Sequence, residues 1–233
     1  MAPPAERGTT AGFYVQVQNA LEEVSRLLEI HRELTGTGRG RRHNVGVLNK
    51  SGIVLVVSCW EAFVEDLASQ GFDWLLANAT SPDSFPRKVL TLASRELREA
   101  DDARRVWELA DTGWRRVLER HRVDILKRYT GKLNTPRARQ VDELFADLLG
   151  LALVSGSWHS EGVTNAKLKQ SLEDLVTLRG EIAHRVQASR AVLKRDVSNA
   201  SKLVERLAVC SSNTVRTFLM TRASQCPDPW PKF

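Results

Sequence analysis

Residues 52–68, GIVLVVSCWEAFVEDLA, begin like a buried strand and continue like a helix. The β-branched run at 53–57, taken alone, favours a strand. Helical spacing then continues without a turn residue, at Trp60, Phe63, Val64 and Leu67. The segment is therefore predicted to lie in one long, largely buried helix over about residues 44–79.

The rest of the chain has the same periodicity. Apolar residues recur every three or four positions, and strict alternation over strand lengths is nearly absent. The sequence predicts an all-α protein, a helical bundle with an additional charged helical insertion. Further helices are expected at about residues 10–34, one or two within 89–129, and then 141–153, 166–187 and 190–221. We expect a single domain, residues 1–233, with irregular tails at 1–9 and 225–233, and an interhelix linker at 155–165.

Composition narrows the class of protein. A formal charge of +6 and a pI near 9.5 make a polyanionic partner plausible. Cys59, Cys210 and Cys226 form no metal-binding or disulfide pattern, so neither a metal nor another cofactor is expected. The first ten residues lack the apolar core of a secretory signal, and the longest apolar run, 52–60, is too short to span a bilayer. A cytoplasmic protein without a membrane partner is therefore predicted.

An arginine interrupts an apolar helix stripe in the stretch LRGEIAHR, residues 178–185. The stripe consists of Leu168, Leu172, Leu175, Ile182 and Val186, and Arg179 fills its gap. Burying this charge without a partner would cost several kcal/mol. Three interpretations stay open: an ion pair with an inward-facing acid, a side chain that reaches the surface along its aliphatic stem, or a polar cleft that binds phosphate.

Glu61 is the natural partner for Arg179, since it lies between Trp60 and Phe63 in the long apolar helix. If the two helices pack antiparallel, the pair would hold the guanidinium in a fixed plane and leave other donors free for a phosphate oxygen. Glu65, one turn later, is the alternative acid. An ion pair that only fixes helix register fits the pattern equally well.

His184 follows Arg179 by five positions, about 140° around an ideal helix, so the two side chains would flank one groove. Histidine exchanges protons near neutral pH, which cleavage of a phosphodiester by an adjacent 2'-hydroxyl requires. Considered without the rest of the helix, His184 would be an ordinary surface or capping residue.

The combination of Arg179-x4-His184 in the penultimate helix with the earlier helix carrying LVVSCWEAFVEDLA resembles the HEPN superfamily. More narrowly, it is similar to the stand-alone HEPN nucleases of the RiboL-PSP type. The matched segments are residues 48–68 and 168–186. The resemblance implies a metal-independent endoribonuclease that forms a homodimer, with Arg179 and His184 of both subunits lining one cleft.

The resemblance also implies roles for the two residues. His184 would act as general acid or base on the 2'-hydroxyl or the leaving oxygen, and Arg179 would stabilise charge on the phosphorane, giving a 2',3'-cyclic phosphate. Such proteins commonly act as toxins or in phage defence, which implies an RNA substrate and an antitoxin or other regulator. The rival hypotheses are a catalytically silent HEPN module that binds RNA or a protein, and an unrelated helical scaffold with an internally paired Arg179.

The chain departs from the family pattern at two positions. Gly180 stands where a polar residue often follows the arginine, and Glu181 is a further candidate for a supporting role there. Val186 stands two positions after the histidine, where a toxin subgroup paired with small nucleotidyltransferases has a tyrosine. That partnership is not expected here.

Two further regions could contact RNA. The loop GRGRRHN carries Arg39, Arg41 and Arg42, which could bind phosphates or simply be solvated. Residues 95–139 have a surplus of basic over acidic side chains, with Trp107, Trp114 and Tyr129 interleaved. These aromatics could stack on unpaired bases or be core contacts at helical spacing.

Overall fold

The computed structural model describes residues 11–35, 46–130, 136–159, 161–185 and 191–233. Every regular element within these ranges is helical, so the predicted all-α fold is confirmed. The α-helices are α1 (Gly12–Thr35), α2 (Gly46–Asn78), α3 (Arg87–Ala93), α4 (Arg95–Arg98), α5 (Gly113–Thr130), α6 (Ala138–Leu148), α7 (Asn165–Arg185) and α8 (Lys194–Arg222). Three 3-10 helices accompany them, η1 (Pro82–Ser84), η2 (Ala103–Leu109) and η3 (Val154–Ser157).

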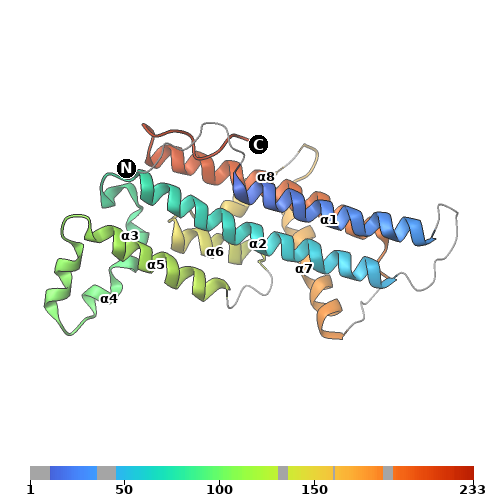
Figure 1. Ribbon diagram of the computed structural model, residues 1–233, viewed down its shortest axis with the longest axis horizontal. Coiled ribbons are helices and arrows are strands. Elements are labelled where there is room, and N and C mark those ends of the chain that lie inside the picture. The colour runs from blue at the N-terminus through green and yellow to red at the C-terminus, as the bar shows by residue number, and fades with distance from the viewer. Residues whose placement is uncertain (1–10, 36–45, 131–135, 160, 186–190) are drawn as a thin grey trace.

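Helix α2 is the central element of the bundle. Figure 1 shows α1, α2 and α8 running side by side along the long axis, and each of the three contacts the other two. Helices α5, α6 and α7 also pack on α2. The predicted charged insertion, α3 to α5, forms one end of the molecule (Figure 1). Because α2 is contacted by five other helices, its β-branched run is buried as a helix, and tertiary packing outweighs local strand propensity.

Close approach of α2 to α8 depends on Gly52. A Cβ at this position would lie 2.8 Å from Cγ1 of Val197 on α8, inside contact distance. The absence of a side chain at Gly52 therefore sets the spacing between the two longest helices of the fold.

The composition of α2 also bears on the membrane question. By length and composition, α2 is the one helix among the described residues that could cross a bilayer. The apolar run at residues 52–60 is too short to indicate this, because the apolar part of the helix extends beyond it. However, 44% of its most apolar 18-residue window is buried inside the protein. Contacts with α1, α7 and α8 explain the apolar composition without a membrane.

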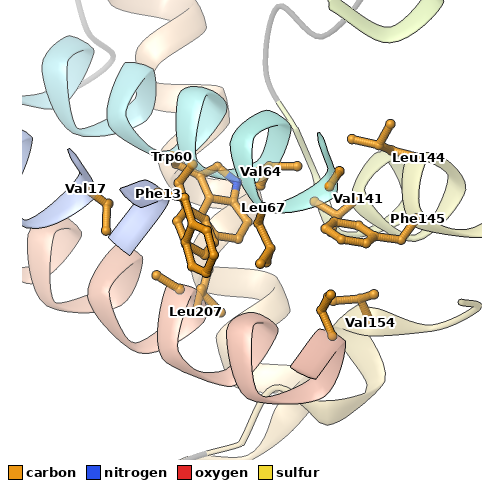
Figure 2. Packing of buried hydrophobic residues seen from close by; sticks show 14 of the residues in the cluster. Phe13, Val17, Trp60, Val64, Leu67, Val141, Leu144, Phe145, Val154 and Leu207 are labelled. Atoms are coloured by element: carbon orange, nitrogen blue, oxygen red, sulfur yellow. The ribbon is translucent and has the colours of Figure 1, made fainter. Parts of the chain in front are cut away.

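Trp60 joins α2 to two other segments of the core. Its ring stacks on Phe63 with centroids 5.7 Å apart and meets Trp158 edge-on at 5.9 Å. Its indole Nε1 donates a 2.9 Å hydrogen bond to the backbone carbonyl of Pro136, just before α6. Figure 2 shows Trp60 with other members of the same buried cluster, from α1, α2, α6, η3 and α8: Phe13, Val17, Val64, Leu67, Val141, Leu144, Phe145, Val154 and Leu207.

The insertion is more broken than the one or two helices predicted. It consists of two short α-helices, a 3-10 helix and α5. Asp102 caps η2 by accepting a 3.0 Å hydrogen bond from the backbone N–H of Arg104. Asp111 then adopts a left-handed conformation, with φ of 49°, which turns the chain into α5. Local capping and this reversal divide a stretch whose apolar periodicity is continuous.

Helix α6 begins before the predicted residue 141 and ends before the predicted residue 153. Gly150 and Leu153 both have positive φ, 72° and 60°, so the helix cannot continue through them. A Cβ at Gly150 would also lie 2.5 Å from the side chain of Pro86. After α6, the backbone is therefore left-handed at Gly150, which has no side chain to oppose it, and at Leu153, where this conformation is strained.

Segments without regular helix contribute to the core. Trp158, in the predicted linker, is fully buried and donates a 2.9 Å hydrogen bond from its indole to Oγ of Ser211 on α8. Trp230, in the C-terminal tail, is also buried and contacts Phe13 edge-on at 5.0 Å. Arg216 of α8 donates to the Trp230 carbonyl at 2.9 Å. Both segments are thus bound to α8, although Trp158 and Trp230 do not lie in α-helices.

Candidate active site

The start of α7 is fixed by one side-chain amide. Asn165 donates from Nδ2 to the backbone carbonyls of Ser155 at 2.7 Å and Trp158 at 2.8 Å. Because Trp158 is itself anchored on α8, these bonds set the position of α7. Of its predicted apolar stripe, Leu168, Leu172, Leu175 and Ile182 are buried, and Val186 lies outside the described residues. Val176 is buried beside them.

Arg179 lies within this buried stripe. The residue is half-buried, and its Nε is fully enclosed with no hydrogen-bond partner among the described residues. A guanidinium N–H removed from water without an acceptor costs about 1–3 kcal/mol or more. Nε of Arg179 is therefore one of the few buried polar side-chain atoms that the described residues leave unpaired.

Glu61 is the candidate acid that interacts electrostatically with Arg179. Burial raises the pKa of the Glu61 carboxyl, Arg179 partly offsets the rise, and Glu65 adds to it. No ion pair within 4.0 Å joins the described Glu61 and Arg179 side chains, and Glu61 Oε1 is buried without a partner. The pKa of Glu65 is raised by burial and by Asp66, with no contribution from Arg179. Of the two candidate acids, Glu61 is thus the one whose charge acts on Arg179.

Helices α2 and α7 do not pack in the antiparallel arrangement on which the predicted ion pair depends. In Figure 1, α7 crosses α2 obliquely instead of running alongside it, as antiparallel packing would require. The two side chains interact electrostatically, and each keeps one buried polar atom unpaired. The site therefore holds a fixed but unsatisfied pair of opposite charges.

His184 is exposed in the last turn of α7. It projects about 140° around the helix from Arg179, and Gly180 lies between the two directions, about 40° from His184. A Cβ built at Gly180 meets no heavy atom within 4 Å. The surface strip between the guanidinium and the imidazole is consequently open.

Glu181 lies on another side of α7. It is half-buried and lines a groove of about 870 Å³ between α7 and α8, together with Lys202 and Arg206. The structure therefore places Arg179 within the electrostatic reach of Glu61 and Glu181 beside α8, while His184 projects from α7 about 140° away from Arg179.

The other predicted contacts are distributed differently. Arg39, Arg41 and Arg42 lie outside the described residues. Trp114 is buried, and Tyr129 donates a 3.0 Å hydrogen bond from its hydroxyl to Asp147 Oδ2, so both are structural contacts. Trp107 is 76% exposed. No cluster of three or more potential metal ligands occurs among the described residues.

A family model for RiboL-PSP-HEPN domains matches residues 16–215. The chain belongs to the RiboL-PSP-HEPN family. The match begins within α1 and ends within α8, so this HEPN chain is related to the family through its whole bundle, including the charged insertion and both helices of the candidate site. No curated protein and no solved structure matches the chain.

The open space at Gly180 of this HEPN protein gives a first testable prediction. Glycine inside a helix costs about 0.5–1 kcal/mol relative to alanine, and Gly180→Ala meets no steric obstacle. We expect Gly180→Ala to raise the free energy of unfolding of dilute protein by that amount in urea titration.

Gly52→Ala is the matched control, because it is also a helical glycine but its new Cβ would clash with Val197. We expect it to destabilise the protein. A loss of stability in Gly180→Ala as well would mean that the space beside Gly180 is filled in solution.

Proposed function

We propose that this RiboL-PSP-HEPN protein is a metal-independent endoribonuclease whose site forms when two copies bring their α7 helices together. The observation that carries the proposal is the buried, unpartnered Nε of Arg179 beside an open strip that leads to the exposed His184. Because Nε itself is enclosed, a phosphate oxygen would bind the part of the half-buried Arg179 side chain that stays accessible, through a charge-assisted hydrogen bond.

The reaction uses the RNA's own nucleophile. One imidazole removes the proton of the 2'-hydroxyl, the 2'-oxygen forms a bond to the adjacent phosphorus, and the bond from phosphorus to the 5'-oxygen breaks. A second imidazole donates its proton to the leaving 5'-oxygen. Arg179 stabilises the added negative charge on the pentacoordinate phosphorane. The products are a 2',3'-cyclic phosphate and a 5'-hydroxyl end.

Two subunits supply what one lacks. Each chain offers a single histidine in this region, whereas base and acid roles at opposite sides of the phosphorus need two. In one chain, Arg179 and His184 also point about 140° apart. A symmetric pairing of the Gly180 faces places both imidazoles and both guanidinium groups around one cleft, in keeping with the self-complementary interface of a two-fold dimer.

The biological role that fits this chemistry is that of a cytoplasmic toxin or phage-defence nuclease. The net charge of the chain, +6, favours association with RNA, a polyanion of high charge density. A nuclease of this kind requires restraint in its host, and we infer a regulator or antitoxin as its protein partner.

The test is incubation of purified protein with end-labelled single-stranded RNA in excess EDTA. We expect fragments that end in 2',3'-cyclic phosphate, identified by mass spectrometry, because no step requires a metal. Binding of RNA without any cleavage would instead assign the chain as a silent HEPN module. Cleavage that EDTA abolishes would contradict the mechanism.

A further inference from the structure

A second groove, of about 500 Å³, lies between the start of α6 and the first half of α7. Its lining is mostly polar, with three basic residues and one acidic residue: Arg137, Arg139, Gln140, Lys169, Gln170 and Glu173, with Ala138 and Ala166 between them. We propose that this groove, named here the α6–α7 groove, binds the phosphate backbone of single-stranded RNA and guides it to His184. The inference rests on the proposed nuclease function and adds a substrate-binding site to it.

The α6–α7 groove is in register with His184 along α7. At 100° per residue, Ala166, Lys169, Gln170 and Glu173 all project within about 60° of the direction of His184. Glu173 and His184 are 11 positions apart, about 16 Å along the axis. A strand lying along this face of α7 would therefore pass from the groove to the imidazole without crossing the helix.

The larger groove between α7 and α8 does not share this alignment. Apart from Thr177, which projects about 20° from His184, its residues on α7 project about 60–180° away from that direction. Its floor is apolar, with Ile53, Leu175 and Leu203 among its lining residues. Although it has the larger volume, it is thus on the wrong side of the helix for a strand that must reach the imidazole.

A hydrogen bond also connects the start of the α6–α7 groove to the turn of α2 that carries Glu61. Trp60, the neighbour of Glu61, donates its indole hydrogen bond to the carbonyl of Pro136, and the next residue, Arg137, lines the groove. Glu61 in turn acts electrostatically on Arg179. One turn of α2 therefore positions both the entry of the groove and the arginine of the site.

Two cations in the groove are available to an incoming phosphate. Lys169 has no carboxylate within ion-pair distance among the described residues. Arg139 pairs with Glu143 at 3.0 Å, but its side chain is 87% exposed, so that pair holds it only weakly. Arg137 is committed to Glu173, which also lines the groove. We therefore assign phosphate binding to Lys169 and Arg139.

The test measures binding separately from cleavage. In a His184→Ala background, the affinity for a labelled single-stranded RNA of mixed sequence is followed by fluorescence anisotropy across a series of salt concentrations. Adding Lys169→Ala and Arg139→Ala should weaken binding and reduce the slope of log K against log salt by about 1.4, since each lost phosphate contact on a single strand removes about 0.7.

The matched control adds Lys167→Ala and Arg206→Ala to the same background. This pair removes the same two charges from the α7–α8 groove, and we expect the salt slope to stay unchanged. Equal slopes for both double variants would overturn the groove assignment. If wild-type protein cleaves no RNA while the slopes differ as expected, the groove assignment stands and the proposed nuclease function fails.

Discussion

Alanine at His184 is expected to reduce the kcat/KM for RNA cleavage by about 10²- to 10⁴-fold, the usual contribution of a positioned general acid or base. Arg179→Ala should cost about 10²- to 10³-fold, the range for loss of a preorganised donor to a charged transition state. Both losses should fall mainly on kcat, since each interaction is strongest when charge and protons are in transit. Initial rates on an end-labelled RNA in EDTA measure them.

Stability provides the first control for this prediction. His184 is exposed, so His184→Ala should change the free energy of unfolding by no more than about 0.5 kcal/mol. His159→Ala removes another exposed histidine from a loop outside the site and should cleave RNA as the wild type does.

Arg179→Lys separates charge from geometry. Lysine keeps the positive charge but loses the planar set of donors that binds two phosphate oxygens at once. We expect Arg179→Lys to recover only a small part of the lost rate. Equal cleavage by wild type, His184→Ala and Arg179→Ala would instead identify a contaminating nuclease.

The position of Arg179 could be predicted from sequence because helical periodicity alone assigns it to the buried stripe of α7. Its environment could not. Whether Glu61 closes an ion pair depends on how α2 and α7 cross, and that crossing is set by distant anchors such as Asn165 and the packing of Trp158. The α6–α7 groove was missed for the same reason, since its cations come from helices whose relative position no local pattern encodes.

The fold divides along similar lines. Long amphipathic helices were predictable because burial favours one period throughout. The break at Asp111 was not predictable, because a left-handed residue in a charged stretch does not alter the spacing of the apolar residues. Trp158 lay in a segment rich in glycine and serine that was interpreted as a linker. A tryptophan in such a segment was the available signal, since so large an apolar side chain is most often buried.

The largest effect on stability is expected from Trp60→Ala. Trp60 is fully buried, and truncation of a buried aromatic side chain typically costs about 3–5 kcal/mol. Alanine would also leave the Pro136 carbonyl without its donor and open a cavity beside Phe63 and Trp158. For a chain of this size, the loss corresponds to a fall in Tm of about 6–20 °C, measured by calorimetry.

Two substitutions show what this loss consists of. Trp60→Phe keeps an aromatic ring against Phe63 and loses only the indole donor and part of the volume, so we expect a smaller loss of stability than in Trp60→Ala. Trp107→Ala removes the same side chain from a site that is 76% exposed and should change stability by about 0.5 kcal/mol or less. Similar losses in Trp60→Ala and Trp107→Ala would show that the indole of Trp60 does not join α2 to α6. The position of α6 relative to α2 would then depend on its other buried residues, such as Val141 and Phe145.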